Sequence, residues 1–184
     1  MQTQSSLDLT RLRNRWTALL VISFVVVLLF YRLFAILQGG AYALQWGLQA
    51  SLMLLVQFVS LWKILPLNYR KGETVLLPRL GPGNLLTVVR GSLIALLVGF
   101  LFIDQLPGPW AWLPVVLYFL CDLTDFLDGY LARVSGMVTR LGETLDMNND
   151  ALGVLVVTLL AFQYGTVPWW YLPFGFARYI FLLG

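Results

Sequence analysis

The sequence predicts an all-α protein, a polytopic transmembrane helical bundle with about six spans in its 184 residues. Hydrophobic residues make up 59% of the chain and charged residues only 11%, which excludes an ordinary soluble domain. Several apolar stretches approach or exceed the ~20 residues that a helix needs to cross a bilayer. The prediction is therefore a membrane protein whose chemistry lies where its few charges are concentrated.

The predicted elements follow one another with short turns and one longer polar connector. We expect spans at about residues 16–37, 41–65, 84–103, 109–133, 142–164 and 167–184. The chain then divides into a cytoplasmic polar N-terminus (1–15), an N-terminal transmembrane hairpin (16–67), a polar connector (68–83) and a core (84–184). Glycine and proline in the connector are typical of a linker or a surface segment.

Basic residues mark one side of the membrane. They gather before the first span and after the second and fourth: Arg11, Arg13, Arg15, Lys63, Arg70, Lys71, Arg79, Arg133 and Arg140. By the positive-inside rule these ends are cytoplasmic. Arg32 is an exception, and we expect it to snorkel or to pair within the bundle. A signal peptide cleaved after residues 41–43 is the alternative, but the long apolar run argues against it.

Six of the nine carboxylates lie between residues 122 and 150, in otherwise apolar surroundings. Asp125 and Asp128 are three residues apart and Asp146 and Asp150 are four apart, so each pair shares one helix face. A short connection between the two helices would bring all four together. With no histidine and one cysteine, the chain offers mainly oxygen ligands, which suit Mg²⁺ or Mn²⁺, with Ca²⁺ an alternative. We expect two ions about 4 Å apart.

Small and basic residues follow the first carboxylate pair. Gly129 and Ala132 permit close approach of a helix or a ligand, and Arg133 offers a planar donor fork for phosphate oxygens. Carboxylate-bound metal beside an arginine indicates a diphosphate site. Each residue also has a simpler interpretation, because aspartates at a helix end can be solvated and small residues can serve packing alone. Asp122 and Glu143 lie outside the spacing pattern, and we expect them to be solvated or paired with a basic residue.

The full spacing resembles the signature of the CDP-alcohol phosphatidyltransferase family, D-x2-D-G-x2-A-R-x8-G-x3-D-x3-D. All eight defined positions match: Asp125, Asp128, Gly129, Ala132, Arg133, Gly142, Asp146 and Asp150. Residues 82–90 also resemble the start of that family's first core helix, with Asn84, Thr87 and Arg90 at i, i+3 and i+6. An N-cap at Asn84, with Thr87 and Arg90 on an interfacial face, is the alternative.

The resemblance implies an integral membrane enzyme, usually a homodimer with six core helices. Such an enzyme moves a substituted phosphate from CDP-diacylglycerol or a similar CDP-alcohol to an alcohol and releases CMP. It implies Mg²⁺ or Mn²⁺ held by Asp125, Asp128, Asp146 and Asp150, with Asp150 also acting as general base. Nucleotide and diphosphate contacts would come from Gly129, Ala132, Arg133, Gly142, Asn84 and Thr87. The site would face the cytoplasm, at the plasma (inner) membrane if the protein is bacterial.

The core in this chain resembles an incomplete version of that six-helix fold, preceded by the extra hairpin. About four of the six core helices are present, so we expect a fragment of a longer protein. Two alternatives to a transferase are a divalent-cation transporter, from the intramembrane carboxylates alone, and a non-catalytic membrane fragment. The acceptor is open among glycerol 3-phosphate, inositol or its phosphate, serine, choline-type amino alcohols and another phospholipid. We expect no nucleic-acid partner, because the basic residues sit at helix ends.

Overall fold

The computed structural model describes residues 2–183, and their fold is the predicted all-α bundle. It contains six α-helices: α1 (Gln2–Leu37), α2 (Gly40–Ile64), α3 (Pro82–Val98), α4 (Leu113–Val134), α5 (Arg140–Gln163) and α6 (Leu172–Leu183). Three short 3₁₀ helices lie at the joints: η1 (Leu65–Leu67), η2 (Gly108–Trp112) and η3 (Trp169–Tyr171). No strand forms within residues 2–183, where only two isolated bridges occur.

Four helical stretches are long and apolar enough to cross a membrane: residues 6–37, 40–67, 108–134 and 140–163. Large hydrophobic side chains remain exposed along these helices, as expected for a surface that faces lipid. The chain is therefore built as an integral membrane protein. The other two helices are shorter, since α3 has 17 residues and α6 has 12.

Two predicted boundaries differ from the structure. The polar N-terminal segment is not separate from the first span, because α1 is helical from Gln2 and continues without a break. The third predicted span is too long, since α3 ends at Val98 and not near residue 103. Gln163 of α5 explains this end: its amide donates to the carbonyls of Phe100 and Ile103, and it accepts from the Phe102 amide. These bonds satisfy backbone groups that a longer helix would have paired internally.

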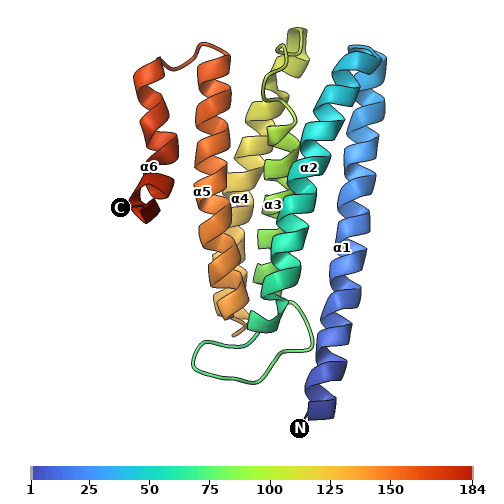
Figure 1. Ribbon diagram of the computed structural model, residues 1–184, viewed down its shortest axis with the longest axis vertical. Helices are drawn as coiled ribbons and strands as arrows, with labels where there is room; N and C mark the ends of the chain where they lie inside the picture. Colours follow the sequence, from blue (N-terminus) through green and yellow to red (C-terminus); the bar gives the residue numbers. More distant parts are fainter. Residues whose placement is uncertain (1, 184) are drawn as a thin grey trace.

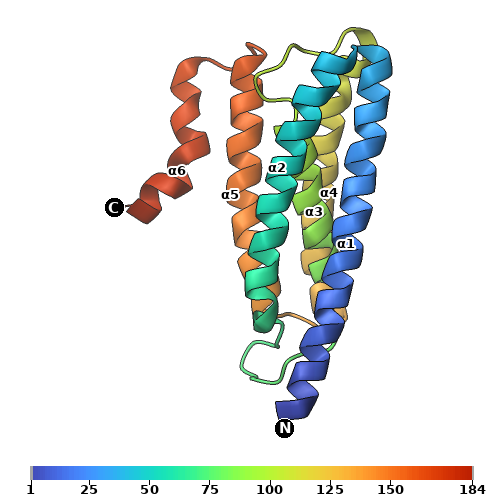
Figure 2. The same cartoon turned by 45° about the vertical axis from the view of Figure 1, so that its right-hand side comes forward.

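Helix α3 is the centre of the bundle (Figure 1). It packs against α2, α4 and α5, while α1 covers α2 and α6 packs on α5. Helices α4 and α5 each make far more contact with α3 than with one another. The N-terminus, the connector between α2 and α3, and the α4–α5 link all lie at the same end of the bundle (Figures 1 and 2). The basic residues gather at this end, so the positive-inside rule predicts that it faces the cytoplasm.

The N-terminal hairpin is joined to α3 by a buried aromatic cluster. Trp46 of α2 is fully buried, with its ring centroid 4.8 Å from that of Phe34 and 5.9 Å from that of Phe100. Gly99 makes room for it, because a Cβ at this position would lie only 2.5 Å from Trp46 Nε1. Edge-to-face packing of this kind adds to the burial of each ring. The hairpin is thus part of the folded core.

The connector between α2 and α3 is an ordered segment fastened by Asn68. This side chain is fully buried, and its Nδ2 donates to the carbonyls of Leu77 and Arg79, both at 3.0 Å. Its Oδ1 accepts from Asn84 Nδ2 at 3.1 Å, which ties the connector to the first turn of α3. The connector also meets α5, where the Arg140 amide donates to the Tyr69 carbonyl. The connector therefore packs against the end of the bundle from which the carboxylates of the motif project.

Candidate metal and nucleotide site

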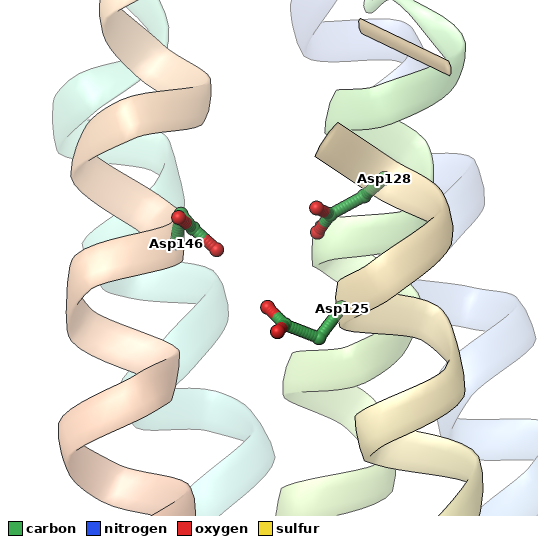
Figure 3. A group of neighbouring side chains, drawn as sticks. All are labelled: Asp125, Asp128 and Asp146. Carbon is green, nitrogen blue, oxygen red and sulfur yellow. The ribbon is translucent and has the colours of Figure 1, made fainter. Parts of the chain in front are cut away.

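Three of the four predicted metal ligands converge between α4 and α5. Asp125 and Asp128 project from α4 toward Asp146 on α5 (Figure 3). One carboxylate oxygen from each lies within 4.8 Å of the others. Asp128 is buried, Asp146 is half-buried and Asp125 is exposed, so the group opens to solvent on one side. The helix faces that the spacing predicts, with Asp125 and Asp128 on α4 and Asp146 on α5, therefore lie toward one another.

Asp150 is not a member of this compact group, although it lies one turn further along the same face of α5. Its carboxylate is 3.3 Å from Nη1 of Arg90. It lines a separate cavity, described below, together with Asp125. The geometry therefore divides the four aspartates into a close triad and one neighbour a turn further along α5.

Arg90 of α3 is the central cation of the site. Its side chain is only 4% exposed, and its guanidinium forms ion pairs with Asp125, Asp146 and Asp150. The pair with Asp146 measures 2.5 Å. One arginine thus holds both helices that carry the carboxylates. Arg90 is not among the site residues that the sequence predicts, although it lies six residues after Asn84 on the buried face of α3.

Thr87 and Asn84 support the site from the same face of α3. Thr87 Oγ1 donates to Asp128 Oδ2 at 2.7 Å, which fixes the buried carboxylate of the triad. Asn84 donates to Thr139 Oγ1 at 2.8 Å, and Thr139 in turn caps α5 by accepting from the Gly142 amide. The alternative of an N-cap at Asn84 is wrong, since the N-cap of α3 is Gly81. The polar face of α3 is internal.

Small residues in and near the motif allow three helices to meet closely. A Cβ on Gly83 would lie 2.7 Å from the Asp128 carbonyl and 2.8 Å from the Ala132 Cβ, so α3 and α4 cross there backbone to backbone. A Cβ on Gly142 would lie 2.4 Å from Asn84 Oδ1, so α5 and α3 also approach too closely at this point for a side chain. Packing is therefore one role of Ala132 and Gly142, whatever ligand they also contact.

Two cavities flank the carboxylates. The first, of about 210 Å³, is lined by all six residues predicted to contact nucleotide or diphosphate: Asn84, Thr87, Gly129, Ala132, Arg133 and Gly142. Asp128 and Asp146 form part of its wall. The second, of about 360 Å³, is lined by Arg90, Asp125 and Asp150 among others. The four aspartates of the motif thus lie between two cavities, and two of the four line each one.

The donor set fits a divalent cation. Three carboxylates within 4.8 Å of one another repel each other, and they need a positive partner in surroundings that are mostly apolar. Oxygen ligands of this kind are those that Mg²⁺ and Mn²⁺ prefer. Arg90 supplies positive charge from one side only, and the opposite side of the triad is open. The residues present could therefore hold a metal ion.

The remaining charged residues near the site have other partners. Glu143 pairs with Lys71 at 2.9 Å and with Arg140 at 3.6 Å, as expected for a carboxylate outside the spacing pattern. Asp122 is exposed and lines the second cavity. Arg178 of α6 donates to the Met147 carbonyl, which brings a cation from the last helix toward α5.

Comparison with known proteins decides the family. The model of the CDP-alcohol phosphatidyltransferase family matches residues 82–184, which is more than half of the chain. The chain belongs to this family. The hairpin and most of the connector precede the matched region. No solved structure matches the chain significantly.

Several curated proteins that are similar to this chain are named as enzymes. A CDP-diacylglycerol–glycerol-3-phosphate 3-phosphatidyltransferase from Cereibacter sphaeroides is 38% identical over 49% of this chain and 41% of its own length. Its namesake from Bacillus subtilis is 31% identical over 47% of this chain and 50% of its own. A putative cardiolipin synthase from Mycobacterium tuberculosis is 32% identical over 48% of the chain and 40% of its own length. The chain spans about half the length of these relatives, or less.

Proposed function

We propose that this chain carries the catalytic centre of a transferase that moves a phosphatidyl group from CDP-diacylglycerol to an alcohol and releases CMP. The observation that carries this proposal is the complete eight-residue motif folded into one site, with three of its aspartates within 4.8 Å of one another. Family membership and the names of the relatives support the same reaction class.

In this mechanism Asp125, Asp128 and Asp146 hold Mg²⁺ or Mn²⁺, whose charge offsets that of the donor diphosphate and of the transition state. The lining of the first cavity suits the CMP half of the donor, with Arg133 near the phosphates and small residues against the nucleoside. Thr87 keeps Asp128 in place through its 2.7 Å hydrogen bond. Two ions, as the spacing predicts, would use Asp150 as a further ligand.

Asp150 is the proposed general base. It faces the second cavity, where an acceptor alcohol would enter. The acceptor oxygen attacks the phosphorus that bears the diacylglycerol, and the bond from that phosphorus to the CMP phosphate breaks. Asp150 takes the proton of the hydroxyl, and CMP leaves with the bonding electrons. With no histidine in the chain, a carboxylate is the base that this site offers.

The named relatives make glycerol 3-phosphate the first acceptor to test. An acceptor of this kind carries its own phosphate, and Arg178 is a cation on the α6 side of α5 that could meet it. The site would open to the cytoplasm, because the basic helix ends lie at the same end of the bundle. A homodimer in the plasma (inner) membrane, if the protein is bacterial, completes the proposal.

The test is CMP release by the chain in detergent or nanodiscs with CDP-diacylglycerol and Mn²⁺. The acceptor panel contains glycerol 3-phosphate, inositol, inositol phosphate, serine, choline-type amino alcohols and a phospholipid. We expect Asp150→Asn to lower the rate by roughly 100-fold or more, whereas Asp104→Asn, in the exposed loop after α3, leaves it unchanged. No CMP release with any acceptor, combined with Mn²⁺ flux into liposomes without nucleotide, would replace the transferase by a cation transporter.

A further inference from the structure

Gln57 of α2 reaches into the bundle beside the carboxylate helix α5. It lines a small cavity of about 20 Å³ together with residues from three helices, which include Thr87, Gly91 and Asn149. A Cβ on Gly91 would lie 3.4 Å from both Gln57 Oε1 and Asn149 Oδ1. The two side-chain amides, one from the hairpin and one from the motif helix, therefore face the same point.

The Gln57 amide is buried without a protein partner. Among the side chains that the structure describes, neither its Oε1 nor its Nε2 has a hydrogen-bond partner. An unpaired buried amide is costly, and the usual remedy is an ordered water. A water needs roughly 10–15 Å³ of such space and two or more polar partners. The cavity is large enough for one water molecule, and the two amides supply the polar partners.

Asn149 connects this cavity to the carboxylates. It is 7% exposed, and its Nδ2 donates to the Thr87 carbonyl at 2.8 Å. Thr87 holds Asp128 through its hydroxyl, and Asn149 itself lies between Asp146 and Asp150 on α5. Whatever fixes Asn149 therefore fixes the rotation of the helix turn from which Asp146 and Asp150 project.

We propose that one water molecule occupies this cavity and bridges Gln57 to Asn149. Gln57 is then a positioning residue: it touches no reacting atom, and it acts through Asn149 on the carboxylates of α5. The N-terminal hairpin, which lies outside the region matched by the family, then helps to shape the metal site through Asn149. This proposal rests on the proposed function only for its effect on catalysis, since water and metal binding do not require turnover.

Gln57→Leu tests this link, with Gln49→Leu as the matched control. Gln49 is the same residue type on the same helix, two turns away, and it does not line the cavity. We expect Gln57→Leu to weaken Mn²⁺ binding, measured by electron paramagnetic resonance, by about tenfold, which is the lower range for residues that support metal ligands. Gln49→Leu should leave Mn²⁺ affinity unchanged. Equal Mn²⁺ affinity in both variants and the wild type would overturn the proposal.

Gly91→Ala tests the cavity itself. The added methyl group would lie 3.4 Å from an oxygen of each amide and expel the water. Alanine favours a helix interior over glycine, which offsets part of the cost of leaving the two amides without a partner. We therefore expect Mn²⁺ affinity to fall as in Gln57→Leu, with at most a small decrease in the unfolding midpoint. Unchanged Mn²⁺ affinity in Gly91→Ala would contradict the water bridge.

Failure of the proposed function would look different. A wild-type chain that binds Mn²⁺ but releases no CMP would refute the transferase, while the difference between Gln57→Leu and Gln49→Leu would still decide this inference. A high-resolution structure of the wild-type chain should show one solvent peak between Gln57 and Asn149. A direct hydrogen bond between the two amides, with no solvent peak, would refute the bridge.

Discussion

Replacing Arg90 by glutamine should tighten metal binding while it slows CMP release. In the structure Arg90 neutralises Asp125, Asp146 and Asp150, so a divalent cation must compete with a guanidinium that is already in place. Glutamine removes the charge and keeps hydrogen-bonding capacity. The metal-free carboxylates then repel one another without a partner, and an arriving cation relieves more repulsion than it does in the wild type.

The size of the effect follows from the exposure of the carboxylates. Two unit charges 4 Å apart interact by about 1 kcal/mol in water and about 4 kcal/mol at the effective dielectric of a protein surface. The three aspartate side chains are 44–54% exposed, which favours the lower part of that range. We therefore expect Arg90→Gln to make the free energy of Mn²⁺ binding about 1–2 kcal/mol more favourable, which lowers the dissociation constant roughly 5- to 30-fold.

The assay is Mn²⁺ binding by electron paramagnetic resonance or calorimetry on the purified chain in nanodiscs. Arg79→Gln is the control, because it removes the same charge from an exposed position in the connector. It should change affinity little. CMP release by Arg90→Gln should fall despite the tighter metal, since the guanidinium also aligns the carboxylates. Mn²⁺ affinity that is equal to or weaker than that of the wild type would refute the picture of a competing cation.

Three further changes test the packing that holds the site. Gly83→Ala places a methyl group against the α4 backbone and should cost about 1–3 kcal/mol of stability, whereas Gly40→Ala, with no atom within 4 Å, should not lower the unfolding midpoint. Asn68→Ala removes one hydrogen-bond partner from each of two connector carbonyls and from the Asn84 amide. We expect the free energy of unfolding, measured by denaturant titration, to fall by about 1–3 kcal/mol. Trp46→Ala removes the central ring of the aromatic cluster between the hairpin and α3, and the free energy of unfolding should fall by about 3–5 kcal/mol. A loss below about 1 kcal/mol would mean that the hairpin does not pack there.

The convergence of Asp125, Asp128 and Asp146 could be predicted from the sequence because helical spacing is a local property. Two residues three or four apart share a face whatever surrounds them, so the pairing of Asp125 with Asp128 followed directly. Arg90 was missed for the opposite reason. Its role depends on α3 lying beneath both α4 and α5, which is a tertiary fact, and a lone arginine in an apolar helix also fits an interfacial position.

The connector and the end of α3 show a second limit. Glycine, proline and charge in residues 68–83 are typical of a loose surface segment, yet Asn68 is fully buried there. A single side chain that pairs with backbone groups far along the chain leaves no periodic signal. The early end of α3 is similar, because it depends on Gln163, which lies more than sixty residues later. Both depend on partners that spacing does not reveal.

The seating of Trp46 against Gly99 has a practical consequence for anyone who would study the family region alone. A chain shortened to begin at Pro82 would lose Trp46, whose ring packs against Gly99. Phe100, which contacts the same ring, would then face lipid or detergent. Asn84 would lose the partner that Asn68 provides. Such an excised piece would keep every residue of the motif and still be a poor surrogate, because part of its scaffold would have been cut away.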